Sequence, residues 1–483
     1  MKHYTAPLQT KDIPNILAMR YASSTMRNIW SESGKILSER ELWIAVMKAQ
    51  RELGLSIPLE AIQAYEAVKE QIDLSSIRAR DRKLRHDVKA RIEEFCALAG
   101  YEHIHKGLTS RDLTDNVEQL QIVKSLKYLR IKAIAALAAI ALHALEFQDL
   151  VLAARTHNVV AQPTTLGKRF AMFGQELLIA LERLDQLIER YPLRGLKGAV
   201  GTLLDQKTLF ADDSKKVDRL QKSLLKHLGF KNLLNAVGQV YPRSMDFDVV
   251  TALHQLGSGP SSFCKTLRLM AGQGLFSEGF QKDQVGSSSM PHKMNSRNCE
   301  RVNGLQVILS GYVTMTSFLS GDQWNEGDVS CSVVRRVVLP DSFFAMDGLF
   351  ETFLTILQEM KVFPERIRLE VDQVTPFLSS TTLLMKAVQK GIGREEAHQL
   401  LKKHSTNVME DLLKGRIERN DLVSRLGQDE RFPFSEKEII AILADPKNFI
   451  GEATSQVQEF SKNVEDWIRK FPDSKGLQPE PLV

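Results

Sequence analysis

The sequence contains few cysteines, and no two of them are close together. Among its 483 residues only four are cysteine, namely Cys96, Cys264, Cys299 and Cys331. Their isolation excludes the paired spacing of a zinc site and the dense spacing of a disulfide scaffold. We therefore expect reduced thiols, as in a cytoplasmic protein, and no metal site.

Membrane-directed segments and blocks of like charge are missing as well. Residues 1–14 have no apolar core that could act as a signal peptide, and the most apolar run, 133–145, is shorter than the ~20 residues that span a bilayer. The 64 basic residues only slightly exceed the 59 acidic ones and are spread thinly, which is weak evidence for nucleic-acid binding. We expect a soluble globular protein with neither a membrane nor a nucleic acid as partner.

Helix-breaking residues are absent from a long stretch of the chain. No glycine lies between Gly107 and Gly167, and no proline lies between Pro58 and Pro163. Apolar residues recur there every three or four positions, and the Ala/Ile/Leu run that follows is apolar on all sides. This pattern predicts one long buried helix over residues 112–150.

The same helical periodicity recurs elsewhere, while strand-like alternation is nearly absent. It predicts further helices at 39–54, 168–190, 215–230, 246–276, 298–319 and 340–360. Because 483 residues exceed one ordinary core, the sequence predicts an all-α fold of three mainly helical domains around a central bundle of long helices. The expected domains are an N-terminal one at 1–111, the central bundle at 112–364 and a C-terminal one at 365–483.

Polar residues gather at four places where the helices begin or end, and these are the candidate sites. RHDV at 85–88 precedes HIHKGLTSRDLTDN at 103–116, RTHNVVAQPTTLGKR occupies 155–169, QVYPRSMDFD occupies 239–248, and GSSSMPHKMN begins at 286. The first three also fit structural roles, such as a surface charge cluster, a helix cap or a loop between two helices. The free N–H groups that open a helix are equally suited to an anion.

The stretch GSSSMPHKMNSRNCE at 286–300 is harder to explain as an ordinary linker. Gly286 and three serines allow a hydroxyl-rich turn whose backbone N–H groups can face an anion. Lys293 adds a positive charge, and Asn295 adds both a donor and an acceptor. The residues alone therefore predict an anion-binding loop, and they do not distinguish among the three serines.

This stretch resembles the signature loop of the fumarase/aspartase superfamily, whose members release fumarate or a close analogue by β-elimination. Together with RHDV, HKGLTSRDLTDN, RTHNVVAQPTTLG and RRVVLPDSFF, in the expected order, it resembles the adenylosuccinate lyase family. The resemblance implies removal of fumarate from adenylosuccinate, giving AMP, and from SAICAR, giving AICAR, in purine nucleotide biosynthesis. It implies a small nucleotide substrate and neither a metal nor an organic cofactor.

The resemblance also implies which residues carry the chemistry. Ser287 is the expected base, which takes a proton from the carbon next to a carboxylate, and His157 is the expected acid, which protonates the departing nitrogen. His86 is expected to assist or to bind substrate, and residue type leaves open which histidine transfers the proton. The remaining members are Lys293 and Asn295, which should hold the succinyl carboxylates, and Glu300, which should orient the site.

A further set of residues is expected, by the same resemblance, to bind the nucleotide and its phosphate. Arginine suits this role because its planar fork donates two parallel hydrogen bonds. The set is Arg20, Tyr21, Arg85, Asp87, Thr109, Ser110, Gln239, Arg301, Ser332 and Arg336. Two positions depart from the family pattern, with Ser296 where a proline is common and Gly327 where an arginine is expected.

The family's quaternary structure is a homotetramer whose bundle domains form a shared twenty-helix core, with each active site drawing on three subunits. Such an assembly fits a helix that is apolar on all sides, since one chain could hardly cover it. Two alternatives remain open. The first is another fumarate-releasing lyase, such as argininosuccinate lyase, fumarase or an aspartase-like enzyme, and the second is a catalytically inactive relative.

Overall fold

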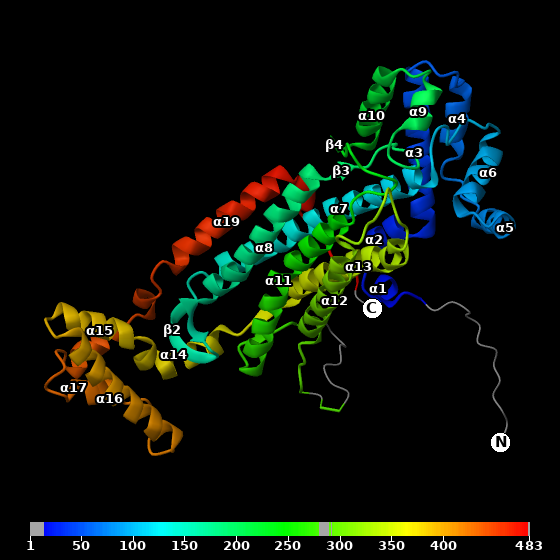
Figure 1. The fold of residues 1–483 in the computed structure, drawn as a ribbon. Coiled ribbons are helices and arrows are strands. Elements are labelled where there is room, and N and C mark those ends of the chain that lie inside the picture. Colours follow the sequence, from blue (N-terminus) through cyan, green and yellow to red (C-terminus); the bar gives the residue numbers. More distant parts are fainter. Residues whose placement is uncertain (1–13, 280–288, 291, 482–483) are drawn as a thin grey trace, which may run out of the picture.

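The fold is a bundle of long helices with smaller helical regions at both ends. The computed structural model describes residues 14–279, 289–290 and 292–481. Five helices, drawn from cyan to yellow in Figure 1, form the bundle. They are α7 (Ser110–Glu146), α8 (Leu166–Arg190), α11 (Ser244–Gly272), α12 (Arg297–Leu319) and α13 (Cys331–Glu359). The prediction of a mainly helical fold is confirmed.

The axis of the bundle is α7, the helix predicted from the stretch without helix breakers. It packs against α8 and α13, and Leu126, Ala133 and Leu137 on it are fully buried. Its length and composition would allow it to cross a membrane, but 56% of its most apolar window is buried inside the molecule. That burial is the pattern of a core helix.

One predicted boundary in the bundle is wrong. The helix expected to begin at residue 340 begins at Cys331, and Pro340 lies inside it. Proline favours the first turn of a helix, where its missing N–H would be unpaired in any case, so the sequence favoured a start at that residue. Here the helix continues through the proline, as α11 does through Pro260.

The N-terminal helices build a second core at one end of the bundle. They are α1 (Ile16–Arg20), α2 (Ser24–Trp30), α3 (Glu32–Glu52), α4 (Leu59–Val68), α5 (Leu74–Leu84) and α6 (Asp87–Ala99). Two later helices, α9 (Leu204–Leu209) and α10 (Ser214–Leu228), lie beside them in Figure 1. Trp43 and Phe95 pack there with Leu220 of α10, so residues from the middle of the chain complete this core.

The C-terminal helices lie at the opposite end. They are α14 (Pro364–Leu378), α15 (Ser380–Gln389), α16 (Arg394–Leu413), α17 (Leu422–Gly427), α18 (Glu436–Leu443) and α19 (Ala453–Lys470). Helices α15 to α18 enclose their own small core. The last helix, α19, returns along α7 and α8, and its Val457 and Phe460 join the core of the bundle.

Short strands occur where the sequence predicted an inter-helix loop. Residues 155–169 contribute to an antiparallel hairpin of β1 (Val151–Thr156) and β2 (Val159–Thr165). His157 and Asn158 form its two-residue turn with φ of 51° and 62°, the left-handed pair that a tight hairpin turn requires. The remaining strands are pairs of two residues: β3 (Pro192–Leu193) with β4 (Asn232–Leu233), and β5 (Phe276–Ser277) with β6 (Lys361–Val362).

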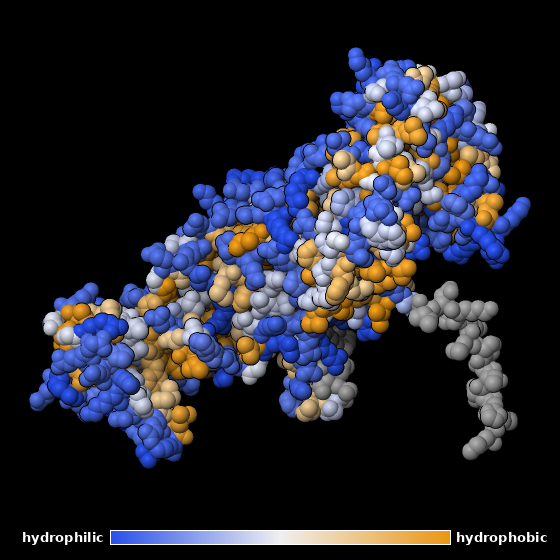
Figure 2. Space-filling model, in the orientation of Figure 1, coloured by the Kyte–Doolittle hydropathy of each residue, from blue (hydrophilic) through white to orange (hydrophobic). Residues whose placement is uncertain are grey.

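A large apolar surface remains uncovered on α12 and α13. Val307, Phe318 and Val333 are 72%, 76% and 71% exposed, and Trp324 between the two helices is 63% exposed. Figure 2 shows apolar side chains gathered over this part of the molecule. Monomeric soluble proteins rarely expose a contiguous apolar patch of this kind, so the face has the character of an interface.

Candidate active site

The predicted site residues that the structure describes lie in three separate places on the chain. The first is the beginning of α7, the second is the beginning of α12, and the third is the turn between β1 and β2. Ser287, the expected base, lies outside the described residues. We call the three places the α7 group, the α12 group and the hairpin turn.

The α7 group includes the junction between α5 and α6. Arg85 ends α5 in a left-handed conformation, and His86 caps α6 because its Nδ1 accepts a hydrogen bond from the Lys89 N–H at 3.3 Å. All three residues of this junction, Arg85 to Asp87, are exposed. Partial desolvation by its neighbours acts to raise the pKa of this half-exposed Asp87 carboxylate, but Arg91, 3.3 Å away, outweighs it and leaves that pKa below its ordinary value.

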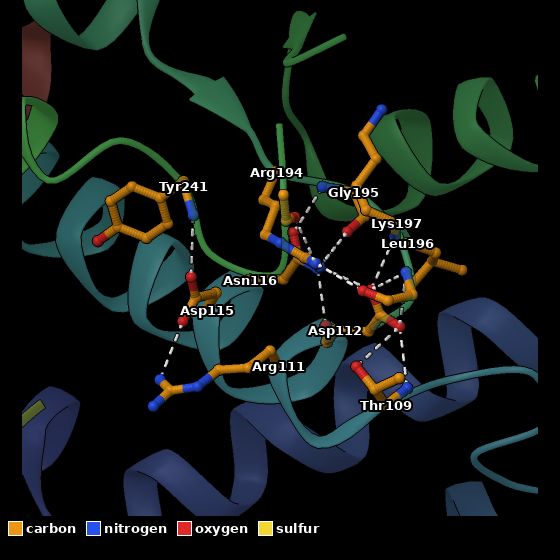
Figure 3. A network of polar contacts seen from close by, with 12 residues as sticks. Thr109, Arg111, Asp112, Asp115, Asn116, Arg194, Gly195, Leu196, Lys197 and Tyr241 are labelled. Carbon is orange, nitrogen blue, oxygen red and sulfur yellow. Dashed lines mark hydrogen bonds and ion pairs between the residues drawn. The ribbon is translucent and has the colours of Figure 1, made fainter. Parts of the chain in front are cut away.

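Thr109 is fixed at the start of α7 by the buried carboxylate of Asp112 (Figure 3). Thr109 donates its backbone N–H to that carboxylate at 2.9 Å. The same carboxylate accepts from the Arg194 guanidinium at 2.6 Å and from the backbone N–H groups of Lys197 and Gly198 at 2.7 and 3.1 Å. Since Asp112 is fully buried, these bonds tie the first turn of α7 to a loop that lies far along the sequence.

A second buried network places the start of α13 beside α7. Arg335 donates to Asp246 and to Glu118, both at 2.6 Å. Burial works against the charge of Arg335, but these two carboxylates raise its pKa well above the ordinary value. The network fixes the turn that carries Ser332 and Arg336, and the side chain of Arg336 remains exposed.

Sequence reasoning identified none of these buried arginines. A local signal was nevertheless present, because Asp112, Asp115 and Glu118 recur every three residues, which places all three on one face of α7. Their partners, Arg194 and Arg335, come from distant segments, and no local sequence pattern identifies them as partners of these carboxylates.

Gln239 completes the α7 group and is in close contact with Gly327. The Gln239 N–H donates to the Glu326 carbonyl at 2.6 Å. A Cβ added to Gly327 would lie 2.9 Å from the Gln239 Cβ, and the φ of 157° at Gly327 is one that residues with side chains rarely adopt. The arginine expected at this position would therefore not fit the backbone found here.

The α12 group brings together Arg20, Tyr21 and Arg301. The Arg301 guanidinium lies over the Tyr21 ring, 5.6 Å from its centroid. Burial lowers the pKa of Arg301, Tyr21 opposes this, and the charge of Arg20 adds to it. One terminal nitrogen of Arg301 is buried without a hydrogen-bond partner among the described residues. A buried donor of this kind is suited to an anion.

At the start of α12 a pocket of about 650 Å³ opens between α11 and the segment that leads into α12. Lys293, Asn295 and Glu300 line it, together with Lys265 and Arg268 of α11. Glu300, 3.6 Å from Arg268, offsets one positive charge, and Lys265 and Lys293 leave the pocket with an excess of positive charge. Such a pocket suits a carboxylate ligand. Lys265 and Arg268 were not among the predicted site residues, because their only signal in the sequence is two basic residues on a mostly apolar helix.

The hairpin turn holds His157 away from the α7 group. His86 precedes α7 and His157 follows it, and a helix of 37 residues is ~55 Å long. Figure 1 accordingly shows β2 and α6 near opposite ends of the molecule. Within one chain, therefore, the two histidines cannot act on the same substrate. Across the described ranges, no three His, Cys, Asp or Glu side chains are grouped as a metal ion would need.

Known proteins with this architecture define the class of the molecule. A family model described as "Lyase" matches residues 18–310. The solved 3-carboxy-cis,cis-muconate lactonizing enzyme from Pseudomonas putida superposes with a TM-score of 0.79 at 21% identity, covering 94% of this chain and 99% of that one. The fumarate lyase from Mesorhizobium sp. BNC1 gives 0.77 at 20% identity, covering 92% and 98%. The protein is a lyase with the fold of the fumarate lyase superfamily.

Sequence comparison narrows this class to one family. Adenylosuccinate lyase of Schistosoma mansoni is 33% identical over 470 residues, which cover 96% of this chain and 97% of that protein. The enzyme of Saccharomyces cerevisiae is 31% identical over 479 residues, covering 97% and 96%. A second family model, "Adenylosuccinate lyase C-terminus", matches residues 376–460. The chain belongs to the adenylosuccinate lyase family, which confirms the resemblance found in its motifs.

Proposed function

We propose that the protein removes fumarate from adenylosuccinate, giving AMP, and from SAICAR, giving AICAR. The observation that carries this proposal is the full-length match to adenylosuccinate lyases, which spans the bundle and the C-terminal helices alike. The cationic pocket at α12 supports it, because both substrates carry the two carboxylates of a succinyl group. The four free cysteines and the soluble metabolic relatives support a place in the cytoplasm.

The proposed mechanism divides the work among the three places. Ser287 takes the proton next to a carboxylate, and Lys293 and Asn295 stabilise the negative charge that develops there. His157 gives a proton to the departing nitrogen, and His86 assists it or binds substrate. The nucleotide and its phosphate bind to the remaining arginines and hydroxyls, among which Arg301 has a buried N–H group with no partner in the described part of the chain.

We infer that the active site is assembled in a homotetramer. Residues that must meet at one substrate lie in three places on a single chain, and the length of α7 separates the α7 group from the hairpin turn. The exposed apolar side chains of α12 and α13 supply a surface for the contact between copies. One copy would supply the α7 group, a second the α12 group and a third the hairpin turn.

The test follows the loss of adenylosuccinate by its ultraviolet absorbance, with purified protein and fumarate measured independently. We expect turnover of adenylosuccinate and of SAICAR, and none of argininosuccinate, aspartate or malate. Turnover of one of the last three alone would assign the fold to another reaction of the superfamily. No turnover of any of them would identify an inactive relative.

A further inference from the structure

The turn between α1 and α2 carries Tyr21 of the α12 group and packs closely against α13. A Cβ added to Gly348 of α13 would lie only 2.6 Å from the Tyr21 Cβ, so the backbone of this turn rests directly on α13. From there the Tyr21 ring reaches the Arg301 guanidinium. Small changes in the turn would therefore move the ring relative to the arginine.

Two carboxylates hold the turn where α2 begins. Asp347 of α13 accepts the Ser23 N–H at 2.6 Å. Glu480, in the tail that follows α19, accepts the Ser24 N–H at 2.9 Å and the Ser24 hydroxyl at 2.6 Å. The first N–H groups of a helix lack partners within it and carry partial positive charge, so carboxylates are favoured there.

Glu480 is itself anchored to the bundle. Its backbone N–H donates to the Glu351 carboxylate at 2.6 Å. Lys132, fully buried on α7, forms ion pairs with both Glu351 and Asp347. The tail, α7, α13 and the start of α2 thus share one hydrogen-bonded cluster, and none of its charged members is among the residues assigned to the substrate.

We propose that Glu480 is a positioning residue for substrate binding, which acts by fixing the turn between α1 and α2. It holds Arg20 and Tyr21 in the orientation in which they and Arg301 receive the nucleotide. This inference rests on the proposed function, which assigns those three residues to the nucleotide. It adds the C-terminal tail to the parts of the chain that determine affinity.

The expected effect of losing Glu480 on KM and kcat follows from where the nucleotide contacts lie relative to the bond that breaks. They are remote from the bond that breaks, so they stabilise the bound substrate and the transition state alike. Helices α1 and α2 have only 5 and 7 residues, and Glu480 binds both the N–H and the hydroxyl of Ser24 at the start of α2. Without the Glu480 contacts, the turn must become ordered when the substrate binds. The unfavourable entropy of that ordering raises KM and leaves kcat unchanged.

The experiment compares Glu480→Ala with Gln478→Ala in the full-length protein. Gln478 lies on the same tail, and its side chain hydrogen-bonds to Gln358 and to the Gly476 carbonyl. We expect Glu480→Ala to raise the KM for adenylosuccinate about tenfold, with kcat within about twofold, and Gln478→Ala to match the wild type. Glu480→Gln keeps one acceptor oxygen and is expected to fall in between. An unchanged KM in Glu480→Ala overturns the inference.

A double variant separates positioning from a general loss of stability. If Glu480 acts through the turn, then Tyr21→Ala combined with Glu480→Ala raises KM by less than the product of the two single effects, because part of the Glu480 effect is exerted through Tyr21. Independent, multiplying effects of the two changes would contradict the assigned role. Equal thermal midpoints for the wild type and Glu480→Ala would confirm that the fold is intact.

Hydrogen exchange distinguishes a failure of this inference from a failure of the proposed function. Amides of residues 21–26 are expected to exchange faster in Glu480→Ala than in the wild type, whatever reaction the protein catalyses. A wild type without turnover on adenylosuccinate would refute the proposed function, and the exchange rates would still decide whether Glu480 holds the turn. Unchanged exchange there would refute the positioning role.

Discussion

His105 shows how a single buried side chain makes the fold sensitive to pH. Its Nδ1 accepts a hydrogen bond from the Trp43 indole at 3.0 Å, which requires an unprotonated ring nitrogen. Burial lowers the pKa of His105 to about 4, Asp112 opposes this, and the charges of Lys89 and His86 add to it. The folded protein therefore holds this histidine neutral in a range where the unfolded chain protonates it.

The sign of the pH effect follows directly. Below an unfolded-state pKa near 6.5, protonation favours the unfolded chain, and the loss of stability grows as the pH falls toward the folded-state value of about 4. We expect the thermal midpoint of the wild type to fall more steeply over this range than that of His105→Asn. Asparagine suits the comparison because it tolerates the φ of 62° at this position.

The control is His398→Asn on the exposed surface, which should keep the wild-type slope. Equal slopes for His105→Asn and the wild type would contradict the prediction.

At this scale the sequence predicted the role of Asp112 only in part. Its place in the first turn of α7 indicated a helix cap, and Thr109 does bond to it. The pattern could not show that Arg194 and the Gly198 backbone bind the same carboxylate, because those contacts join residues about eighty positions apart. Arg336 was chosen over Arg335 by resemblance, and the structure gives the buried ion pairs to Arg335.

Among the elements, the hairpin of β1 and β2 is the one that the local sequence pattern did not predict. It also carries His157, the residue expected to donate a proton. The bundle helices were predictable because a period near 3.6 persists over twenty residues or more. Strands of six and seven residues that contain Pro163 give no comparable signal. The turn of His157 and Asn158 projects the histidine from the end of the hairpin, and two left-handed residues in succession hold it there.

Variants of this turn can separate its geometry from its chemistry. We expect His157→Asn to lower kcat at least a hundredfold, since asparagine tolerates the left-handed backbone but cannot transfer a proton. Asn158→Gly is the matched control and should keep turnover, because glycine adopts the same φ at no cost. The measurement is kcat on adenylosuccinate with circular dichroism for the fold. Near-normal turnover in His157→Asn would remove His157 from its role.

For the whole molecule, the separation of the three groups makes a prediction about mixtures. A variant lacking His86 and one lacking His157 should each be nearly inactive alone. If different chains supply the two histidines, then random mixed tetramers contain intact sites, about a quarter of the total in an equal mixture. We expect refolding or coexpression of the two variants to restore activity in that proportion.

The control for this experiment mixes two variants within one group. His86→Ala and Thr109→Ala both alter the α7 group, and each site takes that group from one chain, so their mixture should restore no activity. Those two residues must come from the same chain, which no mixed site can supply. Absence of recovery in the His86 and His157 mixture would show that a single chain provides both. The resemblance implied active sites shared among subunits, but the residue pattern alone could not give this arrangement, because it depends on where α7 ends in space.

If copies of this protein associate through the uncovered apolar face of α12 and α13, as proposed, then stability becomes a function of protein concentration. Each copy that left such an assembly would return side chains such as Phe318 and Val333 to water, which opposes dissociation. Folding and association would then be one equilibrium, and its midpoint would shift with the amount of protein present. Dilution would reduce both the specific activity and the melting temperature, and the two should decline together.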